Sequence, residues 1–242
     1  CRHSWRLWHP SCDQRFDCAE IAGKSLALTH LKDSADIRNA MIEACLWMNA
    51  EGLNQGTSGN ISVNVEDGLL ITPSGIPYTD ITPAKIVKIP LEAPPDVSLA
   101  FAPSTEWKFH QRLQAARHDM PVVLHAHPPY CTALAVQRRP ILACQYMIAA
   151  VGGHDIPLVD YALYGSAELA DGVVKALTER HGCLMANHGA TVLGETIERA
   201  KWRLLELETL ARTYLFSSIG GKPHILSEKE ISDVMASFAN YG

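Results

Sequence analysis

The 242-residue sequence has no long apolar run, no large excess of charge of either sign and no regular cysteine pattern. No stretch approaches the roughly 20 consecutive apolar residues that span a bilayer, and the first residues carry charges and proline where a signal peptide needs an unbroken apolar core. Seven scattered cysteines, an odd number, favour reduced thiols over a disulfide framework. We therefore expect a cytoplasmic protein with no membrane partner.

The charge balance excludes a second class of partner. The formal net charge is −5 and the sequence pI is near 6.1, so there is no general attraction to a phosphate backbone. Nucleic acid is not expected as a partner, although a local pocket for one small phosphate remains open. Hydrophobic residues make up 47% of the chain, enough for a substantial core, and one globular domain is the expected organisation, with two small domains as the alternative.

Residues 1–32 stand apart from the rest of the chain in composition. They contain two tryptophans and three cysteines but show no clear hydrophobic period. A zinc site in this segment is conceivable, yet no CxxC or HxxxH spacing supports it; its ligands would come from Cys1, His3, His9, Cys12 and Cys18. We interpret 1–32 as an N-terminal extension of unknown role and 33–242 as the main domain.

From Asp33 onward, helix and strand patterns alternate. Residues 34–52 predict an amphipathic helix with Ser34 as its N-cap, and two β-rich runs joined through Asp67-Gly68 predict an antiparallel hairpin. Further helices are expected from Ser104, over 132–137, 166–180 and 195–216, and from Ser227 with a capping box to Glu230; strands are expected at 122–127, 183–186 and 190–194. This interleaving predicts a single layered α/β domain, and the hairpin argues against a purely parallel sheet.

Two histidines one residue apart end the apolar strand 122–127. Since side chains alternate along a strand, His125 and His127 point to the same face and can hold one metal ion. An isolated pair of this kind is more often just two polar residues at a strand end, and only a third ligand would reverse that reading. His188, in a tight NHG turn between two short strands, is the candidate third ligand. Three neutral imidazoles with one open position are typical of catalytic Zn²⁺.

Glu106 follows Ser104 and Thr105 at the start of a predicted helix. It is a candidate fourth ligand or general base, although a glutamate here also stabilises a helix dipole without having any function. The Gly-rich turns 56–62 and 72–77 offer backbone amides and hydroxyl groups to an anion, as does the helix start. Three such features near one candidate metal site suggest a phosphorylated substrate.

Six segments, in this order and spacing, resemble the class II aldolase/adducin family: GLNQGTSGNISV, LLITPSGIPY, PSTEWKFH, VVLHAHPPYCTALA, CQYMIAAVGG and MANHGATVLG. The resemblance runs from about Ser34 to Gly242 and is strongest to the aldolases of L-fuculose phosphate. It implies a three-layer α/β/α fold with a largely antiparallel central sheet. It also implies a homotetramer with active sites between subunits.

The resemblance carries over residue by residue. The implied ligands of one Zn²⁺ per chain are His125, His127 and His188, with Glu106 as a movable fourth ligand that becomes the acid/base. Tyr146 matches the tyrosine that protonates the aldehyde oxygen. Tyr241 matches one that reaches a neighbouring site. The implied phosphate-binding residues are Asn60, Ser74, Gly75, Ser104 and Thr105. Three positions depart from the closest relatives and leave the aldehyde open: Thr105, Tyr164 and Asn187.

The implied activity is cleavage of a ketose 1-phosphate, similar to L-fuculose 1-phosphate, to dihydroxyacetone phosphate and an aldehyde such as lactaldehyde. Zn²⁺ supplies a Lewis acid, so no lysine Schiff base is required. Alternatives within the family are an aldolase or a dehydratase acting on a deoxypentulose or methylthioribulose phosphate. A ribulose-phosphate 4-epimerase typically has aspartate where Glu106 stands, and an adducin-like interaction module lacks the zinc ligands present here.

Overall fold

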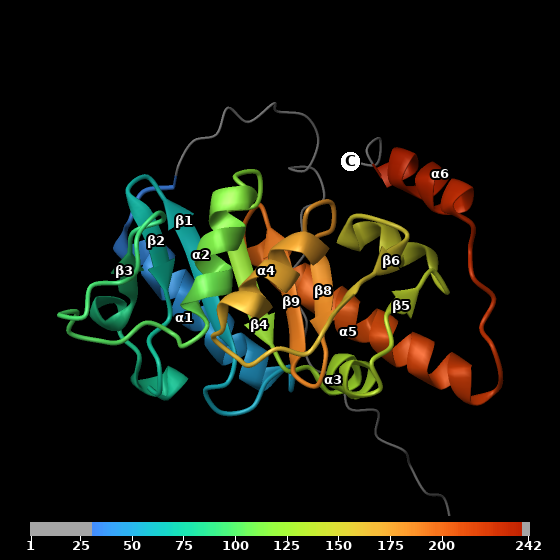
Figure 1. The fold of residues 1–242 in the computed structure, drawn as a ribbon, viewed down its shortest axis with the longest axis horizontal. Helices are drawn as coiled ribbons and strands as arrows, with labels where there is room; N and C mark the ends of the chain where they lie inside the picture. Colours follow the sequence, from blue (N-terminus) through green and yellow to red (C-terminus); the bar gives the residue numbers. More distant parts are fainter. Residues whose placement is uncertain (1–30, 239–242) are drawn as a thin grey trace, which may run out of the picture.

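The computed structural model describes residues 31–238 of the chain (Figure 1). Tyr241 and the ligands of the conceivable N-terminal zinc site lie outside the described residues. Of the segment 1–32, only the last two residues are described, and Leu31 forms a parallel bridge with Val65. Within 31–238, no helix combines the length and the apolar character that crossing a membrane requires.

A seven-stranded sheet forms the centre of the fold, in the order β3-β2-β1-β4-β9-β8-β7. Its strands are β1 (Asn60–Val65), β2 (Gly68–Ile71), β3 (Val87–Ile89), β4 (Val122–Ala126), β7 (Leu158–Val159), β8 (Gly182–Met185) and β9 (Gly189–Gly194). All neighbours are antiparallel except β7 and β8. A separate antiparallel pair is formed by β5 (Ile141–Leu142) and β6 (Asp155–Ile156). The predicted hairpin and the largely antiparallel sheet are therefore confirmed.

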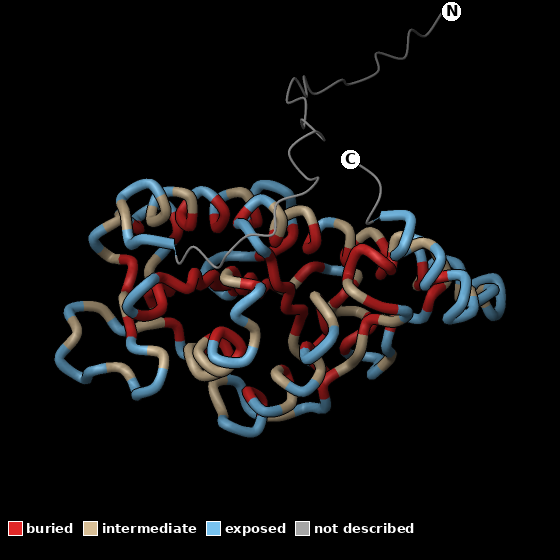
Figure 2. The backbone as a smooth tube through the Cα atoms, turned by 90° about the horizontal axis from the view of Figure 1, so that it is seen from above, coloured by how far each residue is buried: buried red, intermediate tan, exposed pale blue. Residues whose placement is uncertain are grey.

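Helices cover both faces of this sheet, which confirms the three-layer α/β/α architecture (Figure 1). One face carries α1 (Ala35–Ala50), α3 (Pro129–Val136) and α5 (Ile197–Ile219); the other carries α2 (Trp107–Ala116) and α4 (Ala167–Ala176). Side chains of β4 point alternately to the two faces of the sheet. Val122 and Leu124 belong to the apolar cluster under α1, α3 and α5, and Val123 belongs to the cluster under α2 and α4. Figure 2 shows the buried segments gathered in the interior between exposed outer surfaces.

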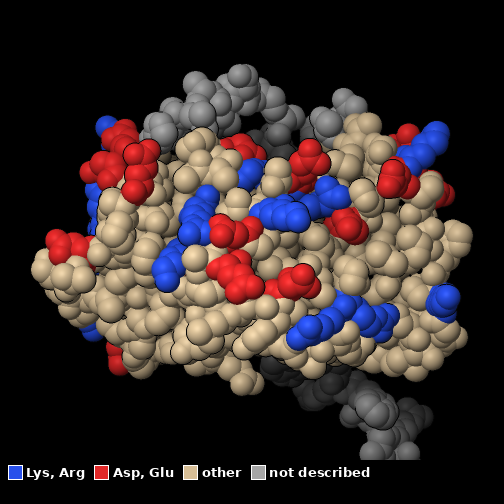
Figure 3. All heavy atoms as spheres, viewed as in Figure 1, with Lys and Arg blue, Asp and Glu red and all other residues tan. Residues whose placement is uncertain are grey.

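Short elements complete the described chain. They are the 3-10 helices η2 (Tyr78–Asp80), η3 (Pro83–Lys85) and η4 (Tyr146–Val151), and the last helix α6 (Glu228–Phe238). Ile231 of α6 is buried in the apolar cluster under α1, α3 and α5. On the face formed by α2 and α4, Arg112 and Asp171 form an ion pair between the two helices, and charges of both signs are interspersed (Figure 3).

The predicted helix boundaries are wrong in places. α2 begins at Trp107 and not at Ser104, whose backbone N–H donates to the Thr72 carbonyl at 2.9 Å. α3 begins at Pro129 and not at Thr132, since proline suits the first turn of a helix. α4 ends at Ala176 instead of residue 180. The predicted capping box of α6 is confirmed by reciprocal hydrogen bonds between Ser227 and Glu230.

Candidate metal and catalytic site

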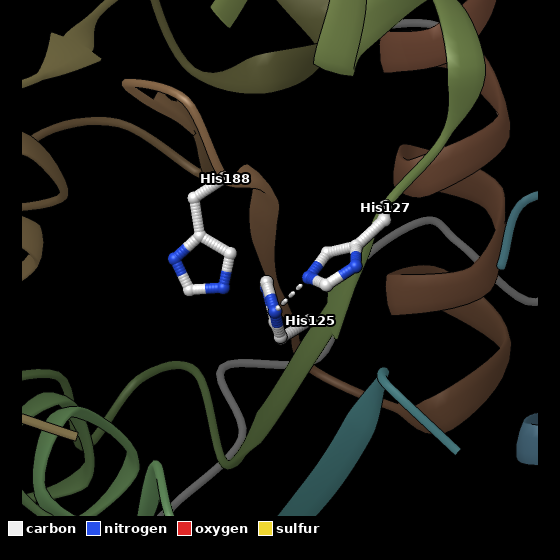
Figure 4. A group of neighbouring side chains, drawn as sticks. All are labelled: His125, His127 and His188. Carbon is white, nitrogen blue, oxygen red and sulfur yellow. Dashed lines mark hydrogen bonds between the residues drawn. The ribbon is translucent and has the colours of Figure 1, made fainter. Parts of the chain in front are cut away.

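Three histidines from neighbouring parts of the sheet meet at one of its ends (Figure 4). His125 lies on β4, His127 follows this strand, and His188 lies in the turn between β8 and β9. Because β4 pairs with β9 in a register that sets Ala126 beside Ala190, the turn comes next to the end of β4. One ring nitrogen of each histidine lies within 4.8 Å of those of the other two. The structure thus brings together the three histidines singled out in the sequence.

The turn that presents His188 depends on two unusual backbone positions. Gly189 packs so closely that a Cβ atom there would lie 2.5 Å from the Ala126 carbonyl oxygen and 2.5 Å from Cδ2 of His127. Asn187 adopts a positive φ of 55°, in the left-handed region that asparagine tolerates better than most residues. The sequence NHG therefore fits the close approach of the turn to β4.

All three imidazoles are held in the neutral form. His125 is fully buried, and burial together with the nearby His127 lowers its pKa to about 3. Burial, followed by the influence of His125, lowers the pKa of His188 to about 4. Burial also lowers the pKa of His127. Neutral imidazoles keep a nitrogen lone pair, which is the form that binds a metal ion.

The tautomer of His125 is set by the backbone of the neighbouring strand. Its Nδ1 lies 2.9 Å from the carbonyl oxygen of Ala190, which can only accept a hydrogen bond, so Nδ1 carries the proton. Nε2 is then the nitrogen with the free lone pair. It faces Nε2 of His127 at 3.1 Å, the pair joined by the dashed line in Figure 4. A backbone carbonyl on the far nitrogen is the usual support of a metal-binding histidine.

Glu106 closes the group from the side of α2, where it occupies the N-cap position. The side chain is buried, with Oε2 3.2 Å from Nε2 of His125 and Oε1 3.3 Å from Nε2 of His188. Oε1 has no hydrogen-bond partner among the described residues, an arrangement that calls for an explanation in a buried carboxylate. Three imidazole nitrogens, with one carboxylate oxygen beside them, are a donor set that fits a divalent transition-metal ion.

Four of the five predicted phosphate-binding residues lie on two loops that are tied together. The Ser74 N–H donates to the loop before α2, and the Ser104 N–H donates back, each at 2.9 Å. Gly75 is exposed with a φ of +70°, and nothing lies within 4 Å of the place where its Cβ would be. Thr105 is exposed beside Ser104. The two loops therefore lie side by side, with Gly75 and Thr105 exposed at the surface and the amides of Ser74 and Ser104 engaged between the loops.

Asn60, the fifth of these residues, is placed differently. Its side chain is buried, and its Nδ2 group donates to Oε2 of Glu106 at 3.0 Å. Its Oδ1 atom contacts the imidazole of His110. Both ends of the Asn60 carboxamide are thus engaged within the protein, directly behind the candidate acid/base.

Tyr146 and Tyr164, two tyrosines singled out in the sequence, lie at the molecular surface. Tyr146 is the first residue of η4, is 51% exposed, and contacts Phe238 of α6 with 6.5 Å between ring centroids. Tyr164 is 63% exposed and precedes Gly165, whose carbonyl accepts a hydrogen bond from Lys108 of α2 at 2.8 Å. The Tyr164 segment is thereby attached to the start of the helix that follows Glu106.

Two buried residues near Glu106 had not been singled out in the sequence. His110 lies one turn beyond Glu106 on α2, and its Nδ1 is 2.7 Å from Oγ of Ser62 on β1. The available signals were two spacings: Asn60 and Ser62 share the polar face of a strand whose other face is apolar, and Glu106 and His110 are four residues apart on a helix.

The fold and the site together define a class: a three-layer α/β/α domain with a group of three histidines and one glutamate that could hold a catalytic metal ion. The family described as Class II Aldolase and Adducin N-terminal domain matches residues 39–215. The chain belongs to this class II aldolase and adducin family, and it is an enzyme, a carbon–carbon lyase of the aldolase type.

Individual relatives agree with this assignment. An L-fuculose phosphate aldolase from Escherichia coli is 42% identical over 203 residues, which cover 84% of this chain and 94% of the relative. A 5-methylthioribulose-1-phosphate/5-deoxyribulose-1-phosphate aldolase from another Escherichia coli strain is 42% identical over 205 residues, with the same coverage of 84% and 94%. The solved structure of an L-fuculose 1-phosphate aldolase matches with a TM-score of 0.81 and 33% identity, covering 85% of this chain and 97% of that one.

Proposed function

We propose that this enzyme is a zinc-dependent aldolase. It would cleave a ketose 1-phosphate similar to L-fuculose 1-phosphate into dihydroxyacetone phosphate and an aldehyde such as lactaldehyde. The observation that carries the proposal is the buried Glu106 carboxylate, which has one oxygen free of hydrogen bonds beside three neutral imidazoles. The 42% identity to an L-fuculose phosphate aldolase supports a phosphorylated sugar as the class of substrate.

The roles follow from the chemistry of each group. Zn²⁺ bound by the three histidines would act as a Lewis acid toward the substrate carbonyl. Glu106 would carry the proton at the carbon whose bond is cleaved, because its Oε1 is free to exchange one. The loops of Ser74, Gly75, Ser104 and Thr105 would bind the phosphate and orient the substrate.

Two tyrosines and an assembly complete the proposal. Tyr146 would exchange the proton at the aldehyde oxygen, and Tyr241 would reach the site of a neighbouring subunit in a homotetramer. The intersubunit site is supported by the position of Tyr146. Its ring is exposed and contacts Phe238 of α6, at a surface that a second subunit would cover. The setting would be the cytoplasm, and residues 1–32 would be an extension to the domain 33–242.

A second candidate is an aldolase for 5-methylthioribulose 1-phosphate or 5-deoxyribulose 1-phosphate. The relative with this name is as similar to the chain, at 42% identity, as the L-fuculose phosphate aldolase. Both kinds of substrate present the same phosphorylated end and differ in the aldehyde part. Tyr164, exposed on a loop attached to α2, is the departure from the family pattern that could alter this part. A dehydratase acting on methylthioribulose phosphate is a further alternative to the aldolase, and the same assays distinguish it.

The decisive experiment assays the purified protein against a panel of ketose 1-phosphates. Release of dihydroxyacetone phosphate is followed with a coupled enzyme, and loss of water is followed separately to detect a dehydratase. We expect the best kcat/KM with L-fuculose 1-phosphate, about one zinc ion per chain, and loss of activity with a chelator. Release of no dihydroxyacetone phosphate from any substrate, or full activity in a metal-free protein, would contradict the proposal.

A further inference from the structure

Four buried polar side chains form a chain of hydrogen bonds that ends at the candidate acid/base. Oγ of Ser62 is 2.7 Å from Nδ1 of His110, and Nε2 of His110 contacts Oδ1 of Asn60. Nδ2 of Asn60 donates to Oε2 of Glu106 at 3.0 Å. Ser62 and His110 are fully buried, and Asn60 and Glu106 are only 4% and 5% exposed. Polar groups at this depth must find their partners inside the protein.

The chemistry of the groups sets the direction of all three hydrogen bonds. An amide NH₂ group only donates, and that of Asn60 faces Oε2 of Glu106 while its Oδ1 atom faces His110. An amide oxygen also only accepts, so His110 carries its proton on Nε2. Burial, followed by the influence of His125, lowers the pKa of His110 well below its usual 6.5. Neutral His110 therefore accepts at Nδ1 from the hydroxyl group of Ser62.

This direction makes the two oxygens of Glu106 unequal. Oε2 is held as an acceptor by the NH₂ group of Asn60, whether or not the carboxyl group carries a proton. Oε1 has no hydrogen-bond partner among the described residues and faces His188 at 3.3 Å. A reversed Asn60 amide would place two oxygens against each other and leave its NH₂ group facing a donor nitrogen of His110.

We propose that His110 is a positioning residue that acts through Asn60 to hold Oε2 of Glu106 as a permanent acceptor, so that proton transfer takes place at Oε1. In the cleavage direction, Oε1 gives its proton to the carbon released from the broken bond; in the condensation direction, it takes the proton from the same carbon. This inference rests on the proposed acid/base role of Glu106. It adds two residues, His110 and Ser62, that act without touching the substrate.

A purely structural role for His110 has to be separated from this one. The ring of His110 stacks on Phe109 with 4.4 Å between centroids, so an apolar replacement could lower stability simply by disturbing packing. Gln114 provides a matched control. It lies one turn further along α2, is fully buried, and donates from Nε2 to the carbonyl of Pro121 at 3.0 Å. Gln114→Leu removes a buried polar group from the same helix without touching Glu106.

The test combines kinetics with a measurement that needs no turnover. kcat, KM and metal content are determined for wild type, His110→Leu, His110→Gln and Gln114→Leu. We expect His110→Leu to lower kcat by about 10–100-fold, the usual effect of removing the support of a reacting group, with metal content unchanged. KM should stay within about threefold, because the change affects the chemical step. His110→Gln keeps an N–H donor and should recover most of the lost kcat, while Gln114→Leu should keep the wild-type kcat.

The second readout is nitrogen NMR of the metal-free wild-type protein, where we expect the ring proton of His110 on Nε2. Three results would overturn the inference: a proton on Nδ1, a rise in KM with unchanged kcat in His110→Leu, or an equal loss of kcat in Gln114→Leu. A wild-type protein that cleaves none of the ketose phosphates contradicts the proposed function instead. The nitrogen signals then decide by themselves whether the hydrogen-bond chain exists.

Discussion

Glu106 is the N-cap residue of α2, and its carboxylate also lies next to the three histidines. As a helix-start residue, it would lose only a dipole interaction on replacement by glutamine, at most about 1 kcal/mol of stability. As the acid/base, Glu106→Gln should lower kcat by roughly 10²–10⁴-fold, because the amide cannot carry the proton. We expect the second result, with zinc retained by the three histidines and with substrate still bound.

Measurement of kcat, KM and zinc content distinguishes the two roles of Glu106. Glu198→Gln is the control, since Glu198 is an exposed glutamate in the first turn of α5 and can contribute only through the helix dipole. Near-normal kcat in Glu106→Gln would mean that another residue carries the proton. Loss of zinc would mean that the carboxylate is needed mainly as a ligand.

His181 predicts a dependence of stability on pH that is separate from the active site. Its pKa is lowered to about 4, first by burial and then by Arg203 and Arg117, against the weaker opposing influence of Glu195 and Asp119. The unfolded chain, with an ordinary histidine pKa near 6.5, takes up the proton first as the pH falls. The stabilisation is therefore complete above pH ~6.5 and is lost as the pH falls toward ~4.

Urea unfolding of wild type and His181→Gln at several pH values tests this expectation. The free energy of unfolding of the wild type should fall relative to that of the variant between neutral and acidic pH, because only the wild type has this titrating group. All other histidines are common to both proteins and cancel in the difference. A difference that does not change with pH would show that His181 titrates normally.

At the scale of the elements, α3 depends on a residue from another helix. Its N-cap position is Pro128, which provides no side-chain cap, and the carboxylate of Glu208 on α5 accepts from the N–H groups of Tyr130 and Cys131, each at 2.9 Å. Glu208→Ala leaves these buried amides without their acceptor. We expect a loss of about 1–3 kcal/mol in the free energy of unfolding.

The control for this change is Glu206→Ala, which removes a glutamate two positions earlier on α5 that is less buried. Urea unfolding monitored by circular dichroism should show a clear loss for Glu208→Ala and a smaller one for Glu206→Ala. Because α3 begins directly after the HAHP segment, metal binding by the Glu208 variant should be measured as well. Equal stability of the two variants would show that water replaces the carboxylate at little cost.

At the scale of the whole molecule, the C-terminal helix lies apart from the histidine group. α6 is reached over an extended segment and stands at one end of the molecule (Figure 1), where Ile231 packs into the apolar cluster. If Tyr241 completes the site of a neighbouring subunit, truncation after Phe238 should lower kcat by about tenfold or more, the usual scale for loss of a proton-transfer group. Zinc content should be unaffected, since all described metal-site residues remain.

The truncation is tested by kinetics together with sedimentation and metal analysis. Tyr241→Phe is the matched control, because it removes only the hydroxyl group and keeps the length of the chain. A truncated protein that falls apart into monomers would show that the last residues hold the assembly together. Equal activity of truncated and full-length proteins would remove Tyr241 from the site.

Several features of the site could be read from the chain because they depend on local geometry. The alternation of a strand places His125 and His127 on one face before any fold is known. The Asp67-Gly68 pair between two β-rich runs specifies a hairpin, and serine followed by glutamate three residues later specifies the start of α6. These patterns involve residues within a few positions of each other, where backbone sterics and local hydrogen bonds decide.

Only the tertiary structure decided how distant residues meet. His188 reaches His125 because β9 pairs with β4, and Ser104 lies beside the loop of Ser74 because backbone hydrogen bonds join the two segments. The direction of the Glu106 carboxylate depends on Asn60 and His110, which become neighbours only when α2 packs on the sheet. Such contacts join residues tens of positions apart, and no local preference specifies them. They are fixed when the apolar faces of sheet and helices are buried together, because each polar group enclosed in that process must find a partner.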